Sequence, residues 1–193
     1  MLKRTKSKWF ARSRPRDPAT IASAVAFTIW RLGLDSIKRM RAAQFSIEAD
    51  ARYFAFLREY LVFLVQVADR LVVPRTDLET RTAFLTALCH RLADLLAENQ
   101  GDLIGGDPAT IRREFIDLVN ERAESYATFG FDANGPDFDF VRYCAHLLLD
   151  LFNAADRAWL IDQIISIEAP AAVETLAPLL DNLVSTAAGS EFA

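Results

Sequence analysis

The segment that most constrains the fold of this chain is YFAFLREYLVFLVQVADRLVV, at residues 53–73. At about 100° per residue, its apolar side chains cover more than half of the circumference of a helix. A helix with so wide an apolar surface must be covered by several neighbouring helices or by a second chain. We therefore predict that this helix lies at the centre of the fold. Its core or interface side chains are expected to be Phe54, Phe56, Tyr60, Phe63 and Leu64.

The polar residues of the same segment share one narrow strip of the helix. Because charged side chains interrupt the apolar run, the segment is not expected to cross a membrane. The strip holds Arg58, Glu59, Gln66, Asp69 and Arg70.

The remaining sequence also has helical periodicity, divided by residues that start or stop helices. Asp-Pro occurs at residues 17–18 and again at 107–108. This pair is typical of a helix start, because Asp accepts from free backbone N–H groups and proline sacrifices no hydrogen bond there. Glycines before residue 107 and the Asn-Gly-Pro of residues 134–136 indicate turns. No run alternates apolar and polar residues with period two, so we expect no strand.

The sequence thus predicts an all-α fold, a single bundle of about six to eight helices. One domain suits a chain of 193 residues of which 52% are hydrophobic. The expected helices cover residues 18–32 with a break at Gly33 and a restart after Asp35, then 46–73, 76–99, 108–128, 137–153 and 155–168, and a last segment that Pro170 opens and Pro178 kinks.

An internal similarity divides the helical domain, residues 17–188, into two candidate repeat units, 17–100 and 107–188. The phrase DPATI begins at Asp17 and again at Asp107, and at the same offset RYFAFL matches RYCAHL at four of six positions. Similarity at a fixed offset is the sequence signature of fused repeats. The alternative is coincidence, since Asp-Pro is a common helix start and the segments between the matches differ.

The first sixteen residues form a basic tail. They carry seven basic side chains and no acidic one, whereas the whole chain has a net charge of −4, so the remainder carries −11. Aromatic residues among cations suit anionic lipid headgroups, and they also suit nucleic acid through phosphate contacts and stacking. A tail that lies in solvent or against the acidic body is the alternative. The candidate residues for binding an anionic partner are Lys3, Arg4, Lys6, Lys8, Trp9, Phe10, Arg12, Arg14 and Arg16.

Two cysteines and two histidines, Cys89 with His90 and Cys144 with His146, are of the types that bind zinc. Adjacent helical residues diverge by about 100°, however, and residues two apart diverge by about 200°. Neither pair can therefore converge on one ion. We expect both cysteines to face the core and both histidines to face solvent, and we predict no metal site.

Other chemical motifs are incomplete. Neither histidine follows a glutamate by three residues, which a di-iron helical bundle requires. The acidic loop from Asp132 to Asp139 lacks the spacing of a calcium loop. The glycines at 101–106 lack the lysine of a phosphate-binding loop. The sequence therefore predicts no catalytic residue and no cofactor, and the chain is not expected to be an enzyme.

These features predict a non-enzymatic helical interaction or adaptor protein that acts by self-association or by binding another protein. The basic tail would tether it to an anionic surface such as a membrane. Two cysteines give no disulfide framework, which favours a cytoplasmic location, at most peripheral to a membrane. One alternative is a nucleic-acid-associated regulatory protein, which the acidic body disfavours. The other is a helical bundle that binds an apolar small ligand, in a cavity where polar groups converge.

Overall fold

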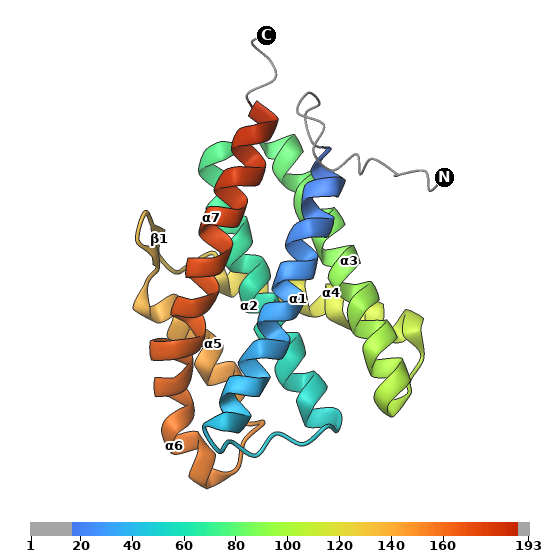
Figure 1. Ribbon diagram of the computed structural model, residues 1–193, viewed down its shortest axis with the longest axis vertical. Helices are drawn as coiled ribbons and strands as arrows, with labels where there is room; N and C mark the ends of the chain where they lie inside the picture. The colour runs from blue at the N-terminus through green and yellow to red at the C-terminus, as the bar shows by residue number, and fades with distance from the viewer. Residues whose placement is uncertain (1–16, 189–193) are drawn as a thin grey trace, which may run out of the picture.

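The computed structural model describes residues 17–188, with side chains as far as Asp181, so the basic tail lies outside the described residues. Within this range the all-α prediction is confirmed (Figure 1). The α-helices are α1 (Pro18–Ala42), α2 (Ala51–Val72), α3 (Leu78–Ile104), α4 (Pro108–Tyr126), α5 (Phe138–Leu149), α6 (Ala154–Gln163) and α7 (Ala169–Ala188). A short 3-10 turn, Val73–Arg75, links α2 to α3, and a π-helical turn, Ile164–Glu168, joins α6 to α7.

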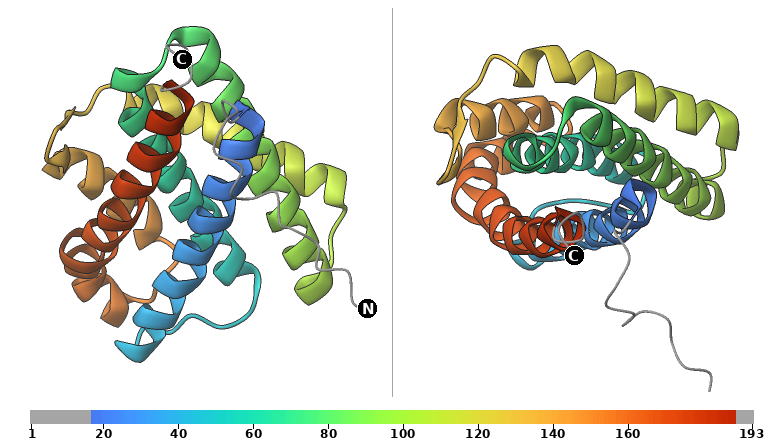
Figure 2. Two further views of the ribbon diagram at one scale, coloured as in Figure 1. Left: turned by 45° about the horizontal axis from the view of Figure 1, so that its top comes forward. Right: turned by 90° about the horizontal axis from the view of Figure 1, so that it is seen from above.

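The helices form three layers around α2. Seen from above, α1 and α7 lie side by side in front of α2, whereas α4 and α5 lie behind it (Figure 2). Helix α2 packs against α1, α3, α4, α5 and α7. Every residue from Tyr60 to Asp69 is buried. The predicted central position of this helix is therefore confirmed.

The predicted break at Gly33 is wrong, because α1 runs unbroken through it. Gly33 instead lies where α1 packs closely against α2. A Cβ atom at this position would lie 2.7 Å from Cδ1 of Leu57 and 3.3 Å from Cδ2 of Leu61. Both leucines are fully buried. The glycine therefore serves helix packing and not helix termination.

Several helices begin directly after a side chain that accepts a hydrogen bond from backbone N–H groups of the first turn. Asp107 accepts from the N–H of Thr110 at 2.8 Å, as predicted. The side chain of Asp17 makes no such bond, so its predicted role as a capping side chain is wrong. Helix α2 begins at Ala51 and not at residue 46, because Asp50 accepts from the N–H groups of Arg52 and Tyr53.

The segment between α4 and α5 also differs from the prediction. A two-strand hairpin, β1 (Phe131–Asp132) with β2 (Gly135–Pro136), forms around the predicted turn, although no strand was expected. These pairs are too short for the period of a strand to register in the sequence. The last segment begins where Pro170 predicts it, because α7 starts at Ala169, and the π turn joins it to α6 without a loop. Pro170 lacks an N–H for the helical ladder, and the altered turn lies immediately before it.

The predicted repeat units, residues 17–100 and 107–188, contribute to one continuous core. Buried side chains from all seven helices form a single cluster. The duplication itself stays a prediction.

Replacing Gly33 with leucine is expected to lower the free energy of unfolding by about 2–3 kcal/mol, because the new side chain would overpack the contact between α1 and α2. The matched control is Gly101→Leu in α3, where a Cβ atom would meet no atom within 4 Å. That change should raise stability by about 0.5 kcal/mol through helix propensity. Urea unfolding of both variants measures the difference. Equal effects at the two positions would contradict the close approach at Gly33.

Candidate functional site

The five apolar residues predicted for the core or interface lie inside the described chain. Each is 2% exposed or less, so none of them presents a surface to a second chain. Their rings stack along α2, with centroids of Phe56 and Tyr60, and of Tyr60 and Phe63, 5.7 Å apart. The structure thus gives Phe54, Phe56, Tyr60, Phe63 and Leu64 a packing role.

The predicted polar strip of α2 faces α3 and α4. Glu59 accepts from Nη2 of Arg122 at 2.8 Å. Asp69 accepts from Nε of Arg81 at 2.6 Å and from Nη2 at 2.7 Å. The strip therefore lies in an interior seam, where each carboxylate meets an arginine of a neighbouring helix. Arg58 contacts the side-chain oxygen of Gln100 and the carboxylate of Glu114, and Arg70 donates to the carbonyl oxygen of Tyr126.

Gln66 is the exception in this strip. The residue is only 6% exposed, yet its side chain makes no hydrogen bond to any residue in the described part of the chain. Gln66 instead lines a pocket of about 330 Å³ between α2, α3 and α4, which we call the α2–α3–α4 pocket.

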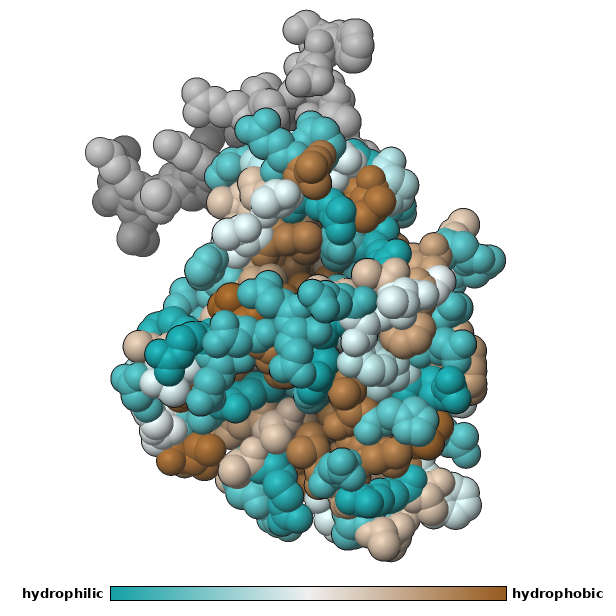
Figure 3. Space-filling view, turned by 180° about the vertical axis from the view of Figure 1, so that it is seen from behind, coloured by the Kyte–Doolittle hydropathy of each residue, from teal (hydrophilic) through white to brown (hydrophobic). Residues whose placement is uncertain are grey.

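The α2–α3–α4 pocket has an apolar wall and a polar side. Figure 3 shows the back of the molecule, where apolar side chains are recessed beside a band of hydrophilic ones. Three helices supply the lining, which consists of Val65, Gln66, Asp69, Arg81, Leu85, Thr86, Cys89, His90, Ile116, Val119, Asn120 and Ala123.

Cys89 and His90 line the same pocket. The sequence predicted that the cysteine faces the core and the histidine faces solvent, and it did not predict a shared pocket. Cys89 is half-buried and His90 is exposed. Burial, reinforced by the negative charge of Asp69, raises the pKa of the Cys89 thiol to about 12. The thiol is therefore protonated at neutral pH and is a poor nucleophile and a poor metal ligand.

Cys144 and His146 lie as the sequence predicted, with the cysteine toward the core and the histidine toward solvent. Cys144 is buried, and its burial raises the pKa of its thiol, whereas His146 is exposed. Among residues 17–181, no three His, Cys, Asp or Glu side chains are arranged to hold a metal ion. No helix in the same range is long and apolar enough to cross a membrane.

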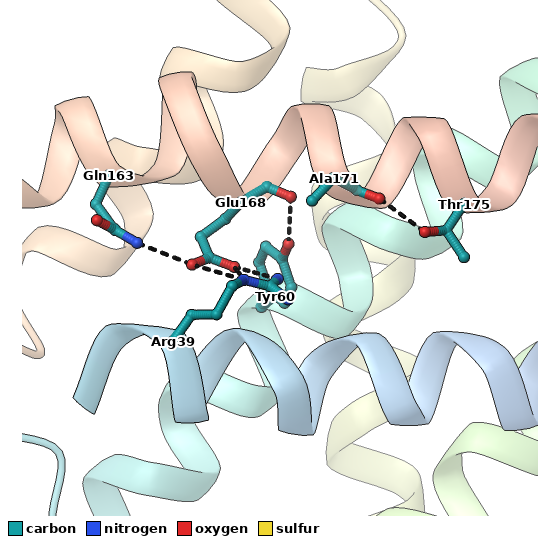
Figure 4. A network of polar contacts seen from close by, with 6 residues as sticks. All are labelled: Arg39, Tyr60, Gln163, Glu168, Ala171 and Thr175. Atoms are coloured by element: carbon teal, nitrogen blue, oxygen red, sulfur yellow. Dashed lines mark hydrogen bonds and ion pairs between the residues drawn. The ribbon is translucent and has the colours of Figure 1, made fainter. Parts of the chain in front are cut away.

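A second polar cluster ties α1 and α2 to the π turn (Figure 4). The fully buried carboxylate of Glu168 accepts from Nε of Arg39 at 3.1 Å and from Nε2 of Gln163 at 2.9 Å. The hydroxyl of Tyr60 donates to the carbonyl oxygen of Glu168 at 3.0 Å. Ionic hydrogen bonds to Glu168 raise the pKa of Arg39. These contacts hold α1, α2 and the π turn together.

A groove of about 320 Å³ lies between the hairpin, α5 and α7, and we call it the α5–α7 groove. Its lining includes two carboxylates, Asp137 and Glu174, and no basic side chain. Phe138 at its edge is 61% exposed. The guanidinium of Arg142 lies 5.8 Å from the centre of the Phe138 ring. Phe138 therefore faces away from the core, whereas Phe140 on the same helix is fully buried.

Comparison of the chain with protein-family models, with curated proteins and with solved structures finds no match.

Alkylation of Cys89 by iodoacetamide is expected to be slow at neutral pH. Its rate should rise about tenfold per pH unit from pH 8 to pH 11, because the thiolate fraction keeps increasing up to a pKa of about 12. The folded pKa exceeds the usual value of 9.0, so this thiol also contributes stability that is complete below pH 9 and is lost as the pH rises through 12. Mass spectrometry of the labelled peptides measures the rate. A plateau near pH 9 would contradict the buried environment.

Replacing Arg39 with methionine is expected to lower the free energy of unfolding by about 2 kcal/mol, because Glu168 would be left buried without its cation. This figure is at the low end for a buried pair, since the Arg39 side chain is 36% exposed. The double variant Arg39→Met with Glu168→Leu should recover part of the loss, which chemical denaturation measures as a coupling energy. Additive effects of the two changes would show that the pair is not coupled.

Proposed function

We propose that this protein is a non-enzymatic interaction protein that self-associates, with the α5–α7 groove of one copy receiving the basic tail of another. The observation that carries the proposal is the chemistry of the groove, which combines apolar walls, two carboxylates and no basic side chain. Grooves of this kind suit a segment with large apolar and basic side chains.

The apolar part of the groove has contributions from four elements. Pro136 comes from the hairpin, Val141 from α5, and Ile165 and Val173 from the π turn and α7. Phe138, exposed beside them, presents a large apolar surface at the edge. Aromatic residues in such positions provide much of the binding energy at protein interfaces.

Residues 1–16 have the complementary composition. Trp9 and Phe10 are adjacent, and seven basic side chains surround them. The aromatic pair suits the apolar walls, and the cations suit Asp137 and Glu174. Exchange of identical segments between two copies is a low-cost route to a dimer, because each copy supplies both halves of the contact.

The full-length protein is expected to form a dimer that weakens with salt, because exposed charges are screened as ionic strength rises. Sedimentation over a range of concentrations measures the dissociation constant. Phe138→Ser and Trp9→Ser should each raise it by about tenfold or more.

The matched control for these substitutions is Trp159→Ser. Trp159 on α6 is 69% exposed and does not line the groove. Its replacement should leave the dissociation constant unchanged. A protein that stays monomeric at every concentration and salt, or an equal effect of the control, would contradict the proposal.

A further inference from the structure

Gln66 makes no hydrogen bond to any residue in the described part of the chain. The residue as a whole is only 6% exposed, and its amide atoms keep a small contact with solvent. The amide oxygen can accept a hydrogen bond and the nitrogen can donate, so both are free to pair with a ligand. Here the amide opens onto the α2–α3–α4 pocket.

The apolar wall of this pocket indicates the apolar part of a ligand that would fit it. Val65 of α2, Leu85 of α3, and Ile116 and Val119 of α4 supply branched aliphatic side chains. A volume of about 330 Å³ lies at the small end of ligand pockets. The wall therefore suits a compact apolar body of about one ring.

The charged groups of the pocket indicate the net charge of a ligand that would fit it. The only formally charged groups in its lining are Asp69 and Arg81. They neutralise each other through two parallel hydrogen bonds of 2.6 and 2.7 Å. A charged ligand would lose hydration without finding a free counter-charge. A neutral ligand escapes this penalty and can still pair with the donor and acceptor of Gln66.

We infer that the α2–α3–α4 pocket is a binding site for a neutral small molecule that joins a compact apolar body to an amide-like pair of donor and acceptor. The ligand's carbonyl accepts from Nε2 of Gln66, and its N–H donates to Oε1. The apolar body lies against the aliphatic wall. This site involves none of the residues of the α5–α7 groove, so it is independent of the proposed self-association.

Three probes of one shape test the class of ligand on the full-length protein. Benzamide is neutral and carries the donor and acceptor, whereas benzoate is its anionic and benzamidine its cationic counterpart. In a titration followed by amide NMR, benzamide should shift signals from residues 65–69, 85–90 and 116–123. Benzoate and benzamidine should bind at least tenfold more weakly. Absence of benzamide binding, or stronger binding of either charged probe, would overturn the inference.

Gln66→Met separates a ligand contact from a structural one. It keeps the length of the side chain and removes the amide, so benzamide should bind at least tenfold more weakly. The thermal unfolding temperature should not fall, because no residue in the described part of the chain forms a hydrogen bond with the amide that is removed. A drop in this temperature would show that the fold itself uses the amide.

A matched change outside the pocket is Gln100→Met. Gln100 accepts from Nη2 of Arg58 at 2.8 Å and does not line the pocket. Its replacement should lower the unfolding temperature and leave the affinity for benzamide unchanged. Ala123→Leu, which fills the pocket from α4, should abolish binding by a second route. Unchanged affinity in both Gln66→Met and Ala123→Leu would place the probe elsewhere and overturn the inference.

Discussion

The rest of the structure depends on the enclosure of α2 by five other helices. Because nearly all of this helix is removed from water, each of its polar side chains needs a partner in the interior. Glu59 and Asp69 find arginines on α4 and α3. These pairs fix the positions of α3 and α4 against α2, and the aromatic residues on other faces of α2 fix the remaining layers. Gln66 on this helix has no such partner among the described residues, which directs attention to the pocket that it lines.

The two functional proposals rest on surfaces at different distances from α2. The α5–α7 groove is peripheral, where Phe138 remains exposed next to carboxylates. The α2–α3–α4 pocket lies on the polar seam, where Gln66 lacks a partner among the described residues. We propose that the groove receives a segment of protein and that the pocket receives a small molecule.

The angular spread of apolar residues was sufficient to predict that α2 is central, since it depends only on helical geometry. The break at Gly33 was predicted wrongly. A glycine that lets two helices pack closely cannot be distinguished, from its neighbours in the sequence, from a glycine that ends a helix. The capping by Asp107 but not by Asp17 depends on side-chain rotamers that the identical DPATI segments do not specify. The pocket was not predictable, because residues of three helices meet there only through tertiary packing.

Hydrogen exchange of the α2 backbone tests the central position of this helix most directly. If α2 is enclosed as described, the amides of residues 60–69 exchange only when the whole domain unfolds. Their exchange free energies should then equal the free energy of unfolding from denaturant titration. Exchange free energies lower than those of α1 or α7 by about 2 kcal/mol or more would show that α2 opens first, and would contradict the account.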